Sequence, residues 1–150
     1  IRLFPSAERS KFARKNIKEL AVKDCLNLNF NGYIHNKSLW TGDCDCSHRR
    51  RIDFRKLLNG TLVCIEVDEN QHSSYTDEEI RYNDIMMVHG GNIIFIRFNP
   101  DRYKINGKVI NKDIRERLEI LRNTVERIEI DLENSVNFGL FTIRKLFYDE

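Results

Sequence analysis

Several features that would assign this chain of 150 residues to a common functional class are missing from its sequence. No apolar run is long enough to span a bilayer, and charges follow almost at once at the amino end, so we expect neither a membrane segment nor a signal peptide. A glycine-rich phosphate loop, a Gly-x-Ser-x-Gly elbow and a usable Ser-His-Asp order are also missing. These absences argue against a P-loop nucleotide-binding protein and against a serine hydrolase.

Cysteine is scarce and irregularly placed. The four cysteines lack the spacing of a disulfide framework, which predicts a reducing compartment inside a cell, the cytoplasm or the nucleus. One residue separates Cys44 from Cys46, whereas structural zinc sites commonly place about two to four residues between paired cysteines. A zinc ion there would have to recruit His48, Cys25 or His35 as well, so plain loop cysteines are the favoured interpretation.

The excess of basic over acidic residues is also small. A formal net charge of +2 gives no basic field over the whole molecule, so any nucleic-acid surface must come from local clustering. The strongest cluster is Arg49-Arg50-Arg51, directly before Ile52-Asp53. A short run of like charge is commonly a solvated strand end. Arginines beside a catalytic site could equally hold DNA phosphates.

What is present suits a folded domain. The chain has 41% hydrophobic and 32% charged residues, which is typical of a soluble globular protein, and its length predicts one domain over residues 1–150 with a core of its own. It begins with Ile1 rather than Met, which indicates a fragment of a longer protein or a trimmed chain. Other domains of such a protein are therefore expected partners.

Hydrophobic periodicity predicts an α/β fold. Three segments have helical spacing of apolar residues, roughly 6–26, 77–88 and 111–132. The apolar run 92–98 predicts a strand after the second of these helices, and the order strand, helix, strand favours a mixed central sheet flanked by helices. The last apolar run, within 138–148, predicts an edge strand or the seam of a homodimer.

The most informative stretch is a predicted β-hairpin. Two runs, 51–54 and the β-branched 61–68, flank an Asn-Gly pair at 59–60, and Asn-Gly accepts the positive φ angles of a tight turn. Side chains alternate along a strand, so Glu66 and Asp68 are expected on one face of the second strand. Two acids on a core strand are costly unless another group compensates them.

A divalent metal ion is the usual compensation, because hard cations bind carboxylate oxygens. The hairpin would bring Asp53 beside Glu66 and Asp68, and His72, four residues past Asp68, could reach the same cleft as a base. The alternative is an ordinary hairpin with solvated acids and a surface histidine. Four such residues on one hairpin favour the metal site.

These motifs resemble a restriction-endonuclease-like nuclease domain of the PD-(D/E)xK superfamily, close to the very-short-patch repair endonucleases and related homing endonucleases. The residues that carry the resemblance are Ile-Asp-Phe at 52–54, Ile-Glu-Val-Asp-Glu-Asn-Gln-His at 65–72, Glu-Glu-Ile-Arg at 78–81 and Gly-Asn-Ile-Ile-Phe-Ile-Arg-Phe at 91–98. The tail at 96–103 is similar to uncharacterised domains frequent in large DNA viruses, which implies a viral or mobile-element origin. The resemblance runs from about Lys18 to Tyr103, and Leu-Phe-Tyr at 146–148 also fits.

The resemblance implies a role for each matching residue. Asp53 matches the metal-binding Asp, and Glu66 matches the acid of the (D/E)xK motif. Asp68 stands where that motif has Lys, a departure shared with the short-patch branch, in which a later histidine is thought to be the base. His72 matches that histidine. Glu19 matches an accessory acid on the first helix, although a solvated Glu is an equally good interpretation.

Arginines supply the expected contacts to DNA. Arg81 matches an arginine that recurs after the histidine in this branch, and it could orient a carboxylate, touch a phosphate or pair with Asp84 on its own helix. The candidate phosphate contacts are Arg49, Arg50, Arg51, Arg81 and Arg97.

The sequence thus predicts a Mg²⁺- or Mn²⁺-dependent deoxyribonuclease. Asp53, Glu66 and Asp68 would bind the ion, His72 would be the general base and Glu19 an accessory acid. The alternative is a catalytically inactive module with the nuclease fold that binds DNA or a protein, because Asp68 replaces the motif Lys. A third hypothesis takes RNA as the substrate.

Overall fold

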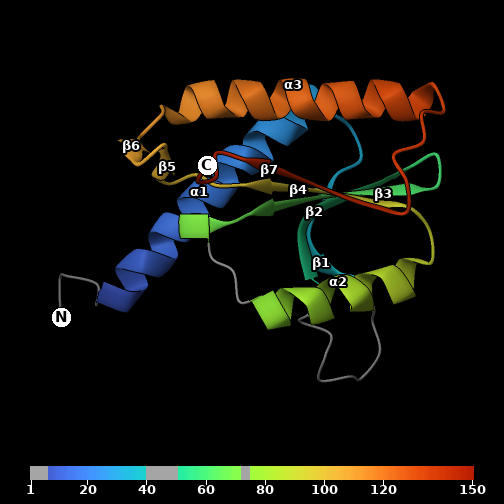
Figure 1. Cartoon of the computed structure of the whole chain (residues 1–150), viewed down its shortest axis with the longest axis horizontal. Helices are drawn as coiled ribbons and strands as arrows, with labels where there is room; N and C mark the ends of the chain where they lie inside the picture. Colours follow the sequence, from blue (N-terminus) through green and yellow to red (C-terminus); the bar gives the residue numbers. More distant parts are fainter. Residues whose placement is uncertain (1–6, 40–50, 72–74) are drawn as a thin grey trace.

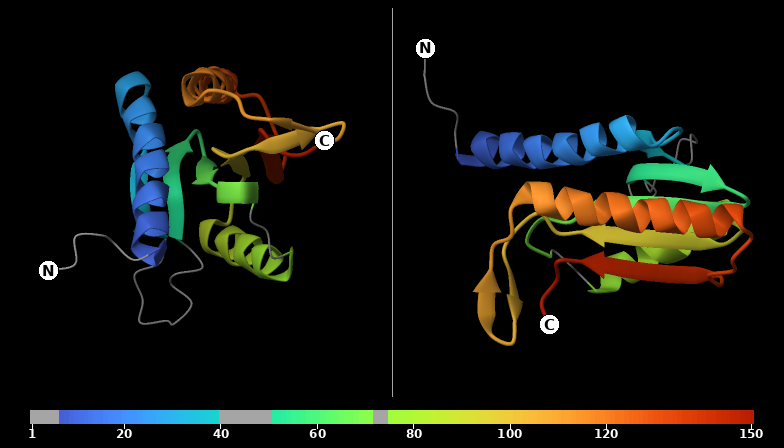
Figure 2. Two further views of the ribbon diagram at one scale, coloured as in Figure 1. Left: turned by 90° about the vertical axis from the view of Figure 1, so that its left-hand side faces the viewer. Right: turned by 90° about the horizontal axis from the view of Figure 1, so that it is seen from above.

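The computed structural model describes residues 7–39, 51–71 and 75–150, and it places a five-stranded sheet between two layers of helices (Figure 1, Figure 2). In chain order the elements are α1 (Ala7–Asn29), β1 (Ile34–Ser38), β2 (Arg51–Leu58), β3 (Thr61–Val67), the 3-10 helix η2 (Glu69–Gln71), α2 (Tyr75–His89), β4 (Ile93–Phe98), β5 (Tyr103–Ile105), β6 (Lys108–Ile110), α3 (Ile114–Glu133) and β7 (Phe141–Leu146). The predicted α/β class and mixed sheet flanked by helices are confirmed at this level.

The large sheet has the order β1-β2-β3-β4-β7. β1, β2 and β3 are antiparallel, while β4 and β7 are each parallel to their neighbour. The predicted hairpin is confirmed, because β2 and β3 meet at a turn in which Asn59 has φ +48° and Gly60 has φ +79°. Helix α2 is the crossover between the parallel strands β3 and β4, and β7 is the edge strand that the last apolar run predicted.

Helices cover both faces of the sheet. Helices α1 and α3 lie on one face and α2 on the other (Figure 2). Ile65 and Val67 of β3 belong to the core on the α1–α3 side, together with Val125 and Ile128 of α3. On the opposite side, Cys64 belongs to a second core cluster beneath α2. The strand therefore alternates as predicted, and Glu66 follows Cys64 onto the α2 face.

Helix α3 illustrates how its sequence determines its placement. Asp113 precedes the helix and accepts a hydrogen bond from the Arg115 amide at 2.8 Å, which satisfies one of the free donors of the first turn. Its apolar stripe is buried against the sheet, as the spacing predicted. Its residues are Leu121, Val125, Ile128 and Leu132. No helix in the described part of the chain has the length and apolarity that crossing a membrane requires.

Candidate functional site at the ends of β2 and β3

The regular pairing of the sheet stops around Asp53. The ladder between β2 and β3 ends at Phe54 and Ile65, although β2 extends to Arg51 and β3 to Val67. On the other side of β2, the residue of β1 across from Asp53 is Asn36, which has φ +52°, in the left-handed region. Irregular backbone on both flanks therefore surrounds Asp53, an arrangement that often re-aims side chains at functional sites.

The Asp53 side chain takes the place of the missing ladder bond. Its Oδ2 accepts a hydrogen bond from the Val67 backbone amide at 2.9 Å. An amide at the end of a buried strand needs such an acceptor, because an unpaired buried donor costs about 1–3 kcal/mol. This bond holds the carboxylate beside the end of β3, where the next side chain on the α2 face is Glu66.

Glu66 is buried against Asp53, with 9% of its surface exposed. Burial, then the charge of Asp53, raises the pKa of Glu66 to about 8, and the Arg81 guanidinium acts in the opposite direction. Arg81 comes from α2 and donates to the Glu66 carboxylate and, at 2.7 Å, to the carbonyl of Arg51. Of the roles that the sequence allowed for Arg81, the structure supports orientation of a carboxylate.

Asp68 occupies a different environment. Arg97 of β4 donates through Nη2 to Asp68 Oδ2 at 2.9 Å, and the Tyr148 hydroxyl donates to the same oxygen. Through Nη1 the same guanidinium also donates to Glu78 and, at 2.7 Å, to the Tyr82 hydroxyl. The carboxylate predicted as a third metal ligand is therefore enclosed in a buried network of its own.

Two predictions find no support among the described residues. Asp68 was expected to share a metal with Asp53 and Glu66, but no group of three or more His, Cys, Asp or Glu within residues 7–39, 51–71 and 75–150 is placed to hold a metal ion. Arg97 was expected to contact phosphate, yet it is only 6% exposed and is bound by two carboxylates. Burial beside Asp68 and Glu78 explains both results, because the charges compensate one another.

The first helix and the first strand bring two more residues to this end of the sheet. Glu19 of α1 lies with Oε2 3.7 Å from His35 Nε2. The His35 ring stacks on Phe54, with 4.8 Å between ring centroids. Burial and Lys23 lower the pKa of His35, while the nearby Asp53 carboxylate opposes this shift. The predicted accessory acid therefore does lie close to the hairpin, through a histidine that the sequence indicated as a possible zinc ligand.

Sequence reasoning missed His35 because its partners are distant along the chain. Its strand pairs with β2, where His35 is opposite Phe54, the neighbour of Asp53. The segment between β1 and β2 gives no signal of that pairing. His72, Arg49 and Arg50, and the cysteines Cys44 and Cys46, lie outside the described residues, so the predicted base, most of the basic cluster and the zinc alternative stay predictions. Arg51 is exposed at the start of β2.

Asp53 and Glu66 fit a magnesium ion better than the predicted set of three carboxylates does. Mg²⁺ typically takes one or two protein carboxylates and completes its shell with water and substrate oxygens. A buried carboxyl whose pKa is raised by an adjacent carboxylate carries a proton that a cation could replace. No family model, curated protein or solved structure matches this chain. The resemblance to restriction-endonuclease-like nucleases accordingly stays a prediction.

Proposed function

We propose that the protein is a metal-dependent endonuclease that hydrolyses DNA phosphodiester bonds at Asp53 and Glu66. The observation that supports this function best is the pairing of the half-buried Asp53 with the buried Glu66, at the point where β2 and β3 lose their regular pairing. Two like charges in contact destabilise a folded protein unless another group compensates them. Such pairs recur at functional sites, where a cation or a proton compensates them.

Asp53 and Glu66 would hold a Mg²⁺ or Mn²⁺ ion, with the Val67 carbonyl as a further oxygen ligand. When bound, the ion would stabilise negative charge on the scissile phosphate and lower the pKa of a bound water. The hydrogen bond from the Val67 amide to Asp53 keeps that carboxylate at the end of β3. Glu19 would act as the accessory acid, positioned by its contact with His35.

We assign proton transfer and phosphate binding to other residues that are near Asp53 and Glu66 in the sequence or in the described structure. His72 follows η2 directly in the chain and would take the proton from the attacking water, since an imidazole titrates near neutral pH. Once the two carboxylates are compensated, Arg81 is available to pair with a phosphate. Arg51 is exposed beside it, and Arg49 and Arg50 precede it in the chain. Together these arginines would fix the DNA backbone at the site.

A second function, binding of DNA or of a protein without chemistry, has its own support. Asp68 replaces the lysine of the superfamily motif, and its charge is already compensated by Arg97, with a further hydrogen bond from Tyr148. Arg81 likewise compensates part of the charge of Asp53 and Glu66 without a metal ion. A protein with the nuclease fold in which arginines compensate the acidic residues in place of a metal ion would retain its binding surface and lose its catalytic activity.

Cleavage by a matched pair of variants separates the two functions. We would incubate the protein, Asp53→Asn and the control Asp24→Asn with supercoiled plasmid and with single-stranded, nicked, mismatched and branched DNAs, in Mg²⁺ or Mn²⁺. Asp24 is exposed on α1 and tests the loss of one charge alone. We expect cleavage by the parent and by Asp24→Asn, and a loss of about a hundredfold or more in Asp53→Asn with DNA binding retained.

Other outcomes are equally informative. Equal cleavage by all three proteins would mean a contaminating nuclease or a different site. Binding of DNA without cleavage by the parent would establish the inactive module in place of the nuclease. A parallel set with RNA strands of the same sequences decides the preferred nucleic acid, because only RNA presents a 2′-hydroxyl.

A further inference from the structure

Strand β7 lies at one edge of the described sheet. Among the described strands its one neighbour in the sheet is β4. The Ile93 amide donates to the Leu140 carbonyl at 3.0 Å. The Asn99 amide donates to the Leu146 carbonyl at 3.1 Å. In a parallel ladder the bonding residues alternate, so even-numbered residues of this strand bond β4 and odd-numbered residues direct their N–H and C=O groups outward. The residues with outward backbone groups are Phe141, Ile143 and Lys145.

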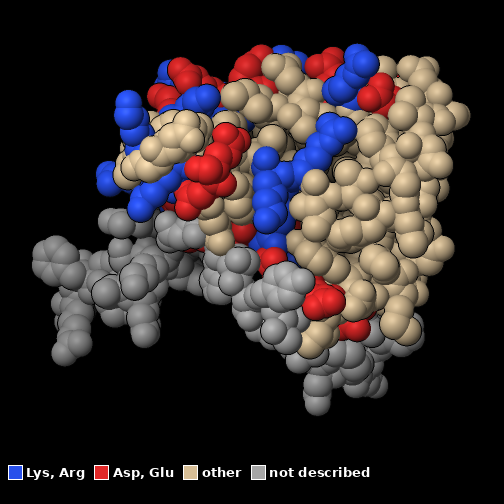
Figure 3. Space-filling model, in the orientation of Figure 1, with Lys and Arg blue, Asp and Glu red and all other residues tan. Residues whose placement is uncertain are grey.

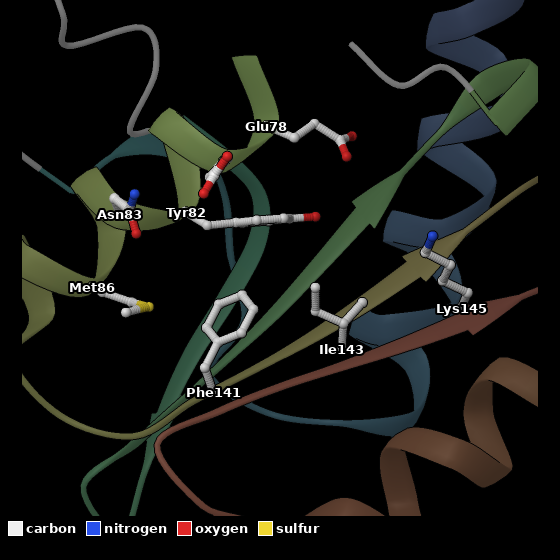
Figure 4. Close-up of a pocket in the computed structure, with 8 residues that line it drawn as sticks. Glu78, Tyr82, Asn83, Met86, Phe141, Ile143 and Lys145 are labelled. Carbon is white, nitrogen blue, oxygen red and sulfur yellow. The ribbon is translucent and has the colours of Figure 1, made fainter. Parts of the chain in front are cut away.

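The same three residues line a groove between β7 and helix α2, with a cavity of about 360 Å³ (Figure 4). The wall opposite β7 is formed by α2, and its residues are Glu78, Glu79, Tyr82, Asn83 and Met86. The Tyr82 and Phe141 rings pack against each other at a tilt of 56°, with 5.2 Å between their centroids. The groove therefore combines an apolar floor, a row of free backbone groups and charges on its rim.

The surroundings of the groove include exposed apolar side chains and few charges. Ile143 is 38% exposed, and Met87 and Leu140 are exposed as well. Figure 3 shows this side of the molecule with a broad area free of acidic and basic side chains, next to a group of Lys and Arg near its centre. An edge strand bordered by apolar surface is a liability in a free protein, because it can pair with another strand.

We propose that the groove binds an extended peptide segment of a partner protein, which adds to the sheet as a strand beside β7. Outward N–H and C=O groups on every second residue recognise a polypeptide backbone, and a strand places alternate side chains on the α2 face. The partner segment would carry apolar residues at alternate positions for the floor formed by Tyr82 and Phe141. Charge complementarity adds an acidic residue near Lys145 and a basic residue near Glu79.

A second copy of this chain is a poorer occupant than such a peptide. Arg144 and Lys145 are adjacent on β7, and antiparallel pairing of two identical strands would bring two such basic pairs into one seam. Lys and Arg on edge strands commonly serve to prevent this kind of self-pairing. We therefore propose that β7, predicted as a possible homodimer seam, instead binds a different protein whose charges are opposite to those of the groove rim.

A random peptide library displayed on phage is the probe that tests this proposal. Selection on the parent protein is compared with selection on Ile143→Lys, which places a charge in the groove, and on Val109→Lys, which places the same charge at a position 60% exposed on β6. Both positions are open to solvent, so both variants should fold. We expect enrichment of alternating apolar sequences on the parent, affinity at least about tenfold weaker on Ile143→Lys, and little change on Val109→Lys.

Amide hydrogen exchange identifies the mode of binding. On addition of an enriched peptide, the amides of Phe141, Ile143 and Lys145 should become protected, while those of Thr142 and Arg144 are protected already. A peptide methylated on the amides that face β7 should not bind. The proposal is overturned if no sequence is enriched on the parent over Ile143→Lys, or if binding leaves those three amides unprotected. Concentration-dependent protection without peptide would overturn it in favour of a dimer.

Discussion

Glu66 and Asp68 leave the end of β3 two residues apart, and each is met by an arginine from a different element. Arg97 keeps its two acids apart, with Asp68 on Nη2 and Glu78 on Nη1, and tyrosine hydroxyls complete the network. Asp53 and Glu66 instead lie against one another, and Arg81 compensates only part of their charge. The acids around Arg97 thus form a network in which the charges are compensated, whereas Asp53 and Glu66 still repel each other. Uncompensated negative charge of this kind is expected at a cation site.

The satisfied network should be the more sensitive of the two to loss of its arginine. Arg97→Met leaves the buried Asp68 carboxylate and the half-buried Glu78 carboxylate without a cation, so we expect a loss of about 3–5 kcal/mol in the free energy of unfolding. Denaturant unfolding monitored by circular dichroism measures it. Arg102→Met, at an exposed position, is the control and should change stability by less than about 0.5 kcal/mol. A loss in Arg97→Met no larger than in the control would contradict the network.

Repulsion between Asp53 and Glu66 should make the free energy of unfolding depend on pH. Folding raises the pKa of Glu66 from 4.5 to about 8, so the unfolded state loses this proton first and the folded protein loses stability as pH rises through that window. Glu66→Gln removes the penalty, and we expect it to exceed the parent in stability by a few kcal/mol above pH 8, with little difference near pH 4.5. Melting temperatures across this range test it, with the exposed Glu79→Gln as control. Parallel curves for Glu66→Gln and the parent would show that Glu66 titrates normally.

A divalent cation should relieve the same repulsion. Mn²⁺ at about a hundred times its dissociation constant stabilises a folded state that binds it by about 2.7 kcal/mol. We expect this gain in the parent and in Asp68→Asn, and its loss in Asp53→Asn, with chelator restoring the starting value. If Asp68→Asn also lost the gain, Asp68 would be a ligand after all and the two regions would act as one site.

The smallest effect is expected from the hydroxyl that completes the Asp68 network. Tyr148→Phe removes one hydrogen bond to a carboxylate that still has Arg97, so we expect a loss of about 1–2 kcal/mol in stability. Burial and Asp68 raise the pKa of Tyr148, so the hydroxyl stays protonated and the loss should not depend on pH near neutrality. Cleavage rates measured on both proteins should agree within a few fold. A large loss of cleavage would place Asp68 in the reaction.

Local sequence determined the elements on which both regions are built. The Asn-Gly turn, the alternation along 61–68 and the helical stripe of α3 each depend on neighbours a few residues away, so their patterns predicted the hairpin and helices at close to their observed bounds. The same alternation placed Glu66 on the α2 face, opposite Ile65 and Val67. It also predicted that Asp53 would lie beside Glu66, because hairpin register follows from the turn.

Only the tertiary structure decided which partners those acids meet. Tyr148 reaches Asp68 from the other end of the chain, Arg97 turns to Asp68 because β4 lies parallel beside β3, and His35 comes near Asp53 because β1 joins the sheet next to β2. The groove between β7 and α2 likewise depends on β7 taking the edge position. The sequence by itself determines the chemistry of each side chain and the spacing between neighbouring residues. The order of strands in the sheet brings charges that are distant in the sequence together, and it decides which of them compensate one another.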